Sequence, residues 1–210
     1  MRKHGLIVSG GEFEDVLSSA DLEVPDYIIA CDRGWLHARR LNLHPDVVLG
    51  DFDSSPRPAA AYPNILTFPV RKDDTDTMLA VRHALSAGCD HLTIICALGG
   101  RMDHTYANIQ TAFFAASQRV PCRILGLSTV MDAYTEDTRV FPARPGWSLS
   151  VFSLSDRSVV SLSGTAYDCE HTLLTSDFPL GTSNQWAASE ARITVEQGTI
   201  LVIRSKMEKE

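Results

Sequence analysis

The sequence predicts an α/β fold in two parts. Residues 1–135 are expected to form an N-terminal three-layer α/β domain with a mostly parallel, Rossmann-like sheet, and residues 136–210 a C-terminal all-β sandwich. In the first part, short continuous apolar runs alternate with helical patterns, which is typical of parallel strands covered on both faces. Glycines and charged residues gather where these runs end. After residue 122 the segments become short and alternate between apolar and polar residues, which is typical of antiparallel sheets.

Five apolar runs are the predicted strands of the first part. Most of them end in a turn signal and lead into a helix-like stretch, as in βαβ units. The runs are Gly5 to Ser9, Tyr27 to Cys31, Val47 to Leu49, Ile65 to Phe68, and Leu92 to Cys96.

Six shorter segments are the predicted strands of the second half. Glu196-Gln197-Gly198 predicts a hairpin turn between the last two of them. The segments are Arg123 to Leu127, Arg139 to Phe141, Ser148 to Leu154, Val159 to Leu162, Arg192 to Val195, and Thr199 to Ile203.

The composition excludes several classes of protein. The 210 residues are 44% hydrophobic, which is enough to bury a core. A formal net charge of -7 argues against a nucleic-acid surface, which is normally basic. No apolar run has the length of a signal peptide or a membrane span, so a cytoplasmic location without membrane contact is expected. The five cysteines are scattered without a C-x-x-C pair, which predicts reduced thiols.

The third apolar run ends in Gly50-Asp51-Phe52-Asp53-Ser54. In an extended segment successive residues point to opposite sides, so Asp51 and Asp53 are expected to face the same way. Mg²⁺ takes hard oxygen ligands, usually one or two carboxylates together with water and substrate phosphates. The motif is therefore a candidate metal site. The alternative is a solvated turn in which an aspartate caps the following backbone.

A second acidic cluster, Arg71 to Asp76, opens the next helical pattern. Thr75 is the predicted N-cap of that helix, with Asp76 in its first turn. Capping explains Thr75 and one aspartate. It does not explain three aspartates close together, because like charges repel unless a cation or a donor holds them.

The third motif is Gly99-Gly100-Arg101-Met102-Asp103-His104, between a predicted strand and a predicted helix. Two glycines permit a close backbone approach to a ligand, and N–H groups at a helix N-terminus suit phosphate. Arg101 is able to add a bidentate phosphate contact. Asp103 is alternatively a helix N-terminal acid, and His104 a structural hydrogen bonder. Ligands of parallel sheets bind at the carboxyl ends of the strands, where these motifs lie, so phosphate chemistry with a metal is predicted.

In this order and spacing, the three motifs resemble those of thiamine pyrophosphokinases. Near the C-terminus, Gly181-Thr182-Ser183-Asn184 resembles part of the family's thiamine-contacting β domain. The resemblance covers nearly the whole chain. It implies an α/β catalytic domain, a C-terminal β-sandwich, a homodimer, and transfer of pyrophosphate from ATP to thiamine with AMP as the other product.

The resemblance also implies roles for individual residues. Asp51, Asp53 and Asp76 are the implied Mg²⁺ ligands and, with Arg101 and Asp103, the implied catalytic residues. Trp186 either stacks on the cationic thiazolium of thiamine or packs in the β domain or a dimer interface. At Cys31-Asp32-Arg33-Gly34 the chain departs from the family's usual Ala-Asp-Gly-Gly turn, and there Arg33 either binds phosphate or faces solvent. The remaining implied binding residues are Asp32, Gly34, Lys72, Asp73 and Thr75 for the nucleotide and Ser183 and Asn184 for thiamine.

Three other functions stay open at this point. A metal-dependent phosphoesterase would use the clustered aspartates with Asp103-His104-Thr105 to hold two metals and activate water, although the other acidic motifs carry no histidine. A pyrophosphokinase for another hydroxymethyl heterocycle has the same requirements. A noncatalytic sensor of ATP or thiamine would not need the full set of aspartates.

Overall fold

The structure is a computed structural model that describes residues 2–53, 56–58, 64–69 and 73–207. Within these residues, ten strands belong to a large mixed sheet and four to a separate antiparallel sheet, which confirms the predicted mixed α/β class. The chain divides into two compact units. The first comprises Met1–Ala115 and Cys122–Leu127, and the second Ala116–Pro121 and Ser128–Glu210. The expected domain boundary at residue 135 stays a prediction.

The strands of the first unit are all parallel, in the order β6-β5-β1-β2-β3-β4. Their central members are the predicted apolar runs, and residues such as Leu6, Ile29 and Ile94 are fully buried. Burial on both faces explains why these runs do not alternate with polar residues. The strands are β1 (His4–Val8), β2 (Tyr27–Cys31), β3 (Val47–Gly50), β4 (Ile65–Thr67), β5 (His91–Ile95) and β6 (Cys122–Leu125).

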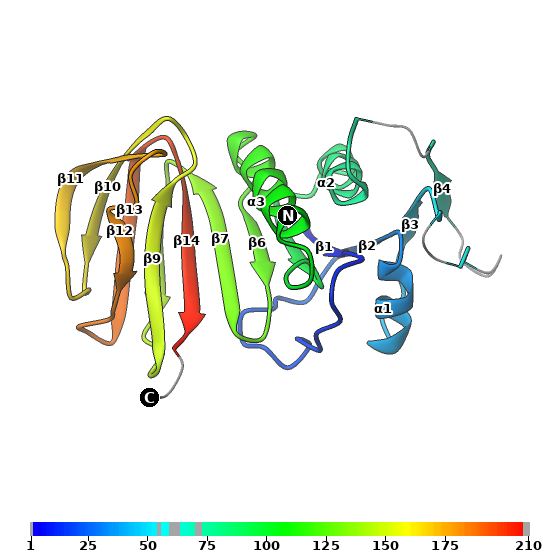
Figure 1. Cartoon of the computed structure of the whole chain (residues 1–210), viewed down its shortest axis with the longest axis horizontal. Helices are drawn as coiled ribbons and strands as arrows, with labels where there is room; N and C mark the ends of the chain where they lie inside the picture. The colour runs from blue at the N-terminus through cyan, green and yellow to red at the C-terminus, as the bar shows by residue number, and fades with distance from the viewer. Residues whose placement is uncertain (1, 54–55, 59–63, 70–72, 208–210) are drawn as a thin grey trace. The chain divides into compact units, whose positions relative to one another are not determined.

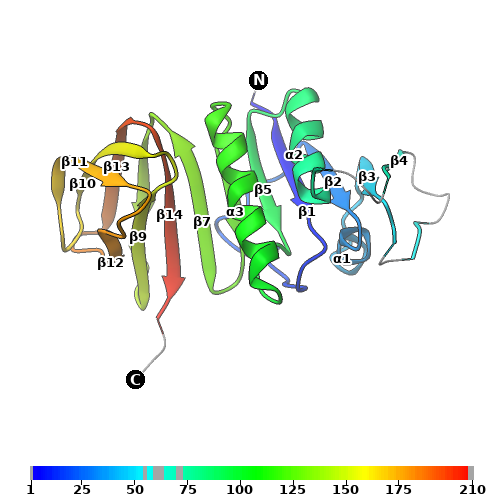
Figure 2. The same cartoon turned by 45° about the horizontal axis from the view of Figure 1, so that its top comes forward.

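In the part of the chain that the structure describes, three helices cover this parallel sheet. Helix α1 (Gly34–Arg40) lies on one face, and α2 (Asp76–Ser86) and α3 (Met102–Ser117) lie on the other (Figures 1 and 2). From β1 the chain runs to β2 and β3 on one side, and α2 then returns it to β5 on the other side of β1. The strand order therefore reverses between β1 and β5, and such a switch point opens a crevice at the carboxyl ends of the strands.

As far as residue 207, the last one described, the second unit contains eight antiparallel strands in two layers. One layer has the order β12-β9-β14-β7 and the other β11-β10-β13-β8. Leu149 and Ile200 from the first layer share one core with Val160 and Ile193 from the second. The strands are β7 (Thr129–Thr135), β8 (Thr138–Pro142), β9 (Trp147–Ser153), β10 (Arg157–Ser163), β11 (Cys169–Thr175), β12 (Gly181–Asn184), β13 (Glu190–Gln197) and β14 (Thr199–Lys206).

The predicted hairpin at Glu196-Gln197-Gly198 is wrong. Strand β13 pairs with β10 and β8, whereas β14 pairs with β7 and β9, so the turn joins two different layers. Gly198 has a left-handed φ of +85°, and a Cβ there would lie 2.6 Å from the carbonyl oxygen of Arg157. A glycine before an alternating segment signals a turn, but it does not say which strand pairs with which.

Candidate functional site

A cleft of about 710 Å³ opens at the carboxyl ends of β1, β2 and β5, at the switch point of the parallel sheet. Backbone hydrogen bonds from Ser9 to Ile95 and from Gly11 to Cys96, both 2.9 Å long, join the ends of β1 and β5. The residues that line the cleft are Ser9, Gly10, Gly11, Glu12, Cys31, Asp32, Arg33, Thr75, Asp76, Thr77, Ala97, Gly99, Gly100, Arg101, His104, Ala107 and Asn108.

The turn after β2 brings Asp32 to the cleft. Asp32 has a left-handed φ of +46°, and its N–H donates to the carbonyl oxygen of Leu49 at 2.8 Å. Gly34 follows and packs directly on the end of β1, because a Cβ at this position would lie 2.0 Å from the carbonyl oxygen of Val8. Gly34 does not line the cleft. Its role is to allow the turn to lie this close to β1.

The predicted cap of α2 is confirmed. The Thr75 hydroxyl accepts a hydrogen bond of 3.1 Å from the N–H of Met78, as an N-cap side chain does. Thr75 and Asp76 line the cleft, and the next residue, Thr77, shares a hydrogen bond of 2.9 Å with Ser9, which directly follows β1. Helix α2 therefore begins at the cleft.

The other two described residues of the acidic cluster, Asp73 and Asp74, do not line the cleft. Asp74 forms an ion pair of 2.9 Å with Arg82 on α2, which supplies the partner that the crowded carboxylates require. Asp73 is exposed and does not line the cleft. Lys72 lies outside the described residues. Of the four described residues of this cluster, 73–76, Thr75 and Asp76 line the cleft.

The segment from Asp51 to Asp53 is a turn, so the expectation of an extended strand end is wrong. Phe52 has a left-handed φ of +56°, and the N–H of Asp53 donates to Oδ1 of Asp51 at 3.2 Å. Aspartate favours this turn because its side chain accepts from the N–H two residues further on. The turn follows β3, next to the cleft-lining residue Asp32: a Cβ on Gly50 would lie 3.1 Å from the Asp32 Cα. Asp51 and Asp53 stand at the same edge of the sheet without lining the cleft.

Arg101 and Asp103 bind each other at the start of α3. Arg101 donates from Nε and Nη2 to the two carboxylate oxygens of Asp103, at 3.1 and 2.5 Å. This pair lowers the pKa of Asp103, and its hydrogen bonds to Arg101 are the main cause. Arg101 and His104 line the cleft, whereas Asp103 does not. Gly99 and Gly100, with φ of +81° and +64°, form the turn that precedes them.

Five further residues of the cleft, each with a polar or thiol side chain, are not among the candidates from the sequence. Burial, helped by the nearby Asp76 carboxylate, raises the pKa of the Cys31 thiol to about 12, so this cysteine stays protonated and is no nucleophile. Asn108 donates to the carbonyl oxygen of Ala97 at 2.8 Å and holds the strand end. Ser9 was the detectable member, since it ends an apolar run before two glycines. The full set is Ser9, Glu12, Cys31, Thr77 and Asn108.

In the second unit, Asn184 is buried and its side chain is fully hydrogen-bonded. Its Nδ2 donates to the Thr165 hydroxyl and the Tyr167 carbonyl oxygen, both at 3.1 Å. Its Oδ1 accepts from the N–H groups of Tyr167 at 3.1 Å and Gln185 at 2.8 Å. An amide side chain has two donors and one acceptor oxygen, and all of them are used here. Asn184 therefore holds its loop.

Ser183 and Trp186 differ in their exposure. Ser183 is exposed, has a left-handed φ of +58°, and lines a pocket of about 520 Å³ with apolar walls such as Val151 and Leu180. Trp186 is half-buried, donates from Nε1 to the carbonyl oxygen of Phe141 at 2.9 Å, and packs against the core of the second unit. This placement matches the packing alternative for Trp186.

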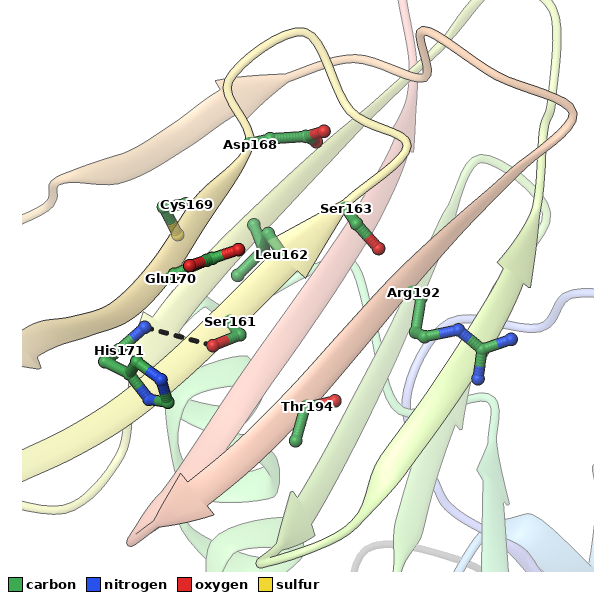
Figure 3. A pocket seen from close by; sticks show the side chains of 9 residues that line it. All are labelled: Ser161, Leu162, Ser163, Asp168, Cys169, Glu170, His171, Arg192 and Thr194. Carbon is green, nitrogen blue, oxygen red and sulfur yellow. Dashed lines mark hydrogen bonds between the residues drawn. The ribbon is translucent and has the colours of Figure 1, made fainter.

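A separate polar hollow of about 700 Å³ lies on the four-stranded layer of the second unit (Figure 3). Two of the charged groups beside it bind each other: Glu196 pairs with His171 Nδ1 at 2.6 Å, and it also accepts from the Ser161 hydroxyl at 2.5 Å. The backbone N–H of His171 also donates to Ser161, as Figure 3 shows. Within the described residues, neither this hollow nor the cleft holds three His, Cys, Asp or Glu side chains arranged for a metal ion.

The fold and the cleft together define an α/β protein of the phosphate-binding class. Glycine turns, carboxylates and guanidinium groups meet at the switch point of a parallel sheet, where anionic ligands bind. The family model "Thiamin pyrophosphokinase, catalytic domain" matches residues 20–124, which is half of the chain. The chain therefore belongs to the thiamin pyrophosphokinase family and is an enzyme, which disfavours the phosphoesterase and sensor alternatives.

Known relatives agree with this membership. The chain is 26% identical over 185 residues to the thiamine pyrophosphokinase of Bacillus subtilis, covering 84% of this chain and 86% of the relative. The crystal structure of a Bacillus subtilis thiamine pyrophosphokinase superposes with a TM-score of 0.85 at 24% identity, covering 98% and 100% of the two chains. The crystal structure of a thiamin pyrophosphokinase family protein from Enterococcus faecalis superposes with a TM-score of 0.77 at 27% identity, covering 98% of this chain and 100% of the other. None of the helices in the described residues is long and apolar enough to cross a membrane.

Proposed function

We propose that this enzyme transfers the pyrophosphoryl group of ATP to the hydroxyl of thiamine, giving thiamine diphosphate and AMP, and that the cleft of the first unit binds the ATP. The observation that carries this proposal is the meeting of the Gly99-Gly100 turn, Arg101 and Asp76 in one cleft at the switch point. A glycine turn at a helix N-terminus offers N–H groups to phosphate, and the guanidinium of Arg101 offers a second contact.

Most of the work in phosphoryl transfer is positioning and charge stabilisation. The thiamine hydroxyl must approach the β-phosphorus in line with the bond that breaks. For Arg101 to contact the transferred group, its pairing with Asp103 has to loosen. The exposure of both side chains, 74% and 62%, means that water replaces part of that pairing at little cost.

The carboxylates at this edge of the sheet fit Mg²⁺ by their chemistry. Asp51 and Asp53 on one turn and Asp76 on the next helix would hold the ion, since Mg²⁺ needs only one or two carboxylates beside water and phosphate oxygens. When bound, the ion supplies positive charge that neutralises the phosphate oxygens. Asp32, which lies against Gly50, is a fourth carboxylate at the same edge.

For thiamine, the exposed Ser183 is the contact that we propose in the second unit, and Asn184 is proposed to act by holding the Ser183 loop in place. A homodimer is part of the same proposal and rests on the family resemblance. A cytoplasmic location is proposed with it. Lys72 and Asp73 are retained as proposed nucleotide contacts on that ground alone.

The product assay tests this function. The protein is incubated with ATP, MgCl₂ and thiamine, and the nucleotide and phosphate products are separated. We expect AMP to form only when thiamine is present, in equal amount with thiamine diphosphate and without free phosphate. ADP as the product, or phosphate release without thiamine, would overturn the proposal.

A further inference from the structure

We propose that Arg33 contacts the phosphate chain of the nucleotide and makes binding to this cleft increase with the number of phosphates. The inference rests on the proposed function in one respect, namely that the ligand of the cleft is a nucleotide. It concerns the part of the cleft between the turns after β1 and β2.

The backbone of Arg33 is fixed on both sides. Asp32 is hydrogen-bonded to the end of β3 through Leu49, and Gly34 packs on the Val8 carbonyl of β1 so closely that no side chain fits there. Arg33 itself caps α1, with its carbonyl oxygen accepting from Leu36 N–H at 3.0 Å. The arginine side chain therefore leaves from a rigid point at the junction of three strands.

The guanidinium lies over the turn after β1. Nη2 of Arg33 donates to the carbonyl oxygen of Gly11 at 3.1 Å, and the residue lines the cleft. A guanidinium has five N–H donors, so this single bond leaves most of them for a ligand. In the described residues Arg33 forms no ion pair with a carboxylate. Arg101, which also lines the cleft, is paired with Asp103.

The position of Arg33 is unfavourable for the helix. A cation at a helix N-terminus opposes the helix dipole, and the favoured N-cap residues are Ser, Thr, Asp and Asn. The Arg33 side chain makes no capping hydrogen bond. A residue that is unfavourable for its own helix is expected at a functional position. The carboxylates of the cleft, Glu12, Asp32 and Asp76, would by themselves repel a polyanion, and Arg33 offsets that repulsion.

His37 holds the turn after β1 when Arg33 is substituted, so the effect of Arg33 on ligand binding can be measured separately. Its Nε2 hydrogen-bonds to the same Gly11 oxygen at 2.9 Å, so this oxygen has two donors. Loss of Arg33 leaves the His37 bond and the backbone bond from Gly11 N–H to Cys96 in place. A change in ligand binding after substitution of Arg33 is then separable from a change in the turn.

The experiment is calorimetric titration of the full chain with adenosine, AMP and ATP in MgCl₂, with thiamine omitted so that no turnover occurs. For Arg33→Gln we expect the Kd of ATP to rise about tenfold or more, the size of one lost charge-assisted contact. The Kd of AMP should rise less and that of adenosine less than twofold. Arg33→Lys keeps the charge and should retain part of the ATP preference.

Two matched variants complete the design. Arg39→Gln removes a guanidinium of the same helix that lies over Trp35 and not in the cleft, and it should bind all three ligands as the wild type does. His37→Phe removes the other donor to Gly11 and should leave the ratio of the ATP and adenosine Kd values unchanged. An Arg33→Gln variant with an unchanged ratio would overturn the role of Arg33 while the proposed function stands. A wild-type chain that does not bind ATP would overturn both.

Discussion

The guanidinium of Arg204 and the carboxylate of Asp132 form an ion pair of 2.7 Å on neighbouring strands of the second unit, and both side chains are only 3% exposed. Arg204 also lies over the ring of Phe141, at 5.3 Å. Removing one partner of a buried pair leaves an uncompensated charge, which costs about 3–5 kcal/mol. We expect Asp132→Ala to lower the free energy of unfolding by this amount in chemical denaturation.

A surface pair of the same unit is the control. Arg119 and Glu136 lie 2.8 Å apart but are 70% and 41% exposed, and such pairs contribute about 0–1 kcal/mol. Glu136→Gln should therefore leave the unfolding curve almost unchanged. Equal losses of unfolding free energy in Asp132→Ala and Glu136→Gln would show that burial of the Arg204–Asp132 pair does not raise the cost of breaking it.

Asn184 and Ser183 are expected to fail in different ways when substituted. Asn184→Ala removes four hydrogen bonds, and at about 0.5–1.5 kcal/mol each the unfolding free energy should fall by at least about 2 kcal/mol. Ser183→Ala should leave stability within about 0.5 kcal/mol of wild type and raise the KM for thiamine. An Asn184→Ala protein with wild-type stability and impaired thiamine use would contradict the structural role of Asn184.

Stability should fall as the solution becomes acidic, and His4 is one cause. Burial, and then the neighbouring His91 ring stacked at 4.7 Å, lower the pKa of His4, although Glu23 and Asp26 oppose this. The folded state resists protonation of His4, whereas the unfolded chain takes up this proton near pH 6.5. The contribution of neutral His4 to the free energy of unfolding is therefore complete above about pH 6.5 and is lost as the pH falls below that value. Tm measured from pH 7.5 to 5.5 should decrease less in His4→Gln than in wild type. If Tm decreased equally with pH in His4→Gln and in wild type, His4 would be excluded as a cause of the loss of stability in acid.

Local signals in the sequence predicted the parts of the structure that local chemistry decides. The buried strands β1, β2, β3 and β5 followed from continuous apolar runs, and the Thr75 cap followed from a threonine before a helical pattern. The coincidence of polar motifs at one sheet edge followed from parallel topology alone. These features need no knowledge of distant contacts.

The features that the sequence could not predict depend on distant partners or on backbone choices. Ser9 and Thr77 meet across 68 positions of the chain, and no local pattern marks that pairing. Phe52 adopts a left-handed conformation that few residues other than glycine take, so the Asp51–Asp53 segment was expected to be extended. An asparagine that binds a substrate and one that holds a loop look alike in sequence, and only the contacts of Asn184 separate them.

The most direct measurement is the turnover of Asp51→Asn and Asp53→Asn with ATP, Mg²⁺ and thiamine, beside their Tm values. Each substitution keeps the size of the side chain and removes the charge that would hold the metal, so we expect kcat to fall about 100-fold or more with Tm almost unchanged. Asp156→Asn, an exposed aspartate of the second unit, is the matched control and should keep wild-type turnover. Full activity in both Asp51→Asn and Asp53→Asn would contradict the claim that the carboxyl edge of the parallel sheet is the metal-dependent catalytic site.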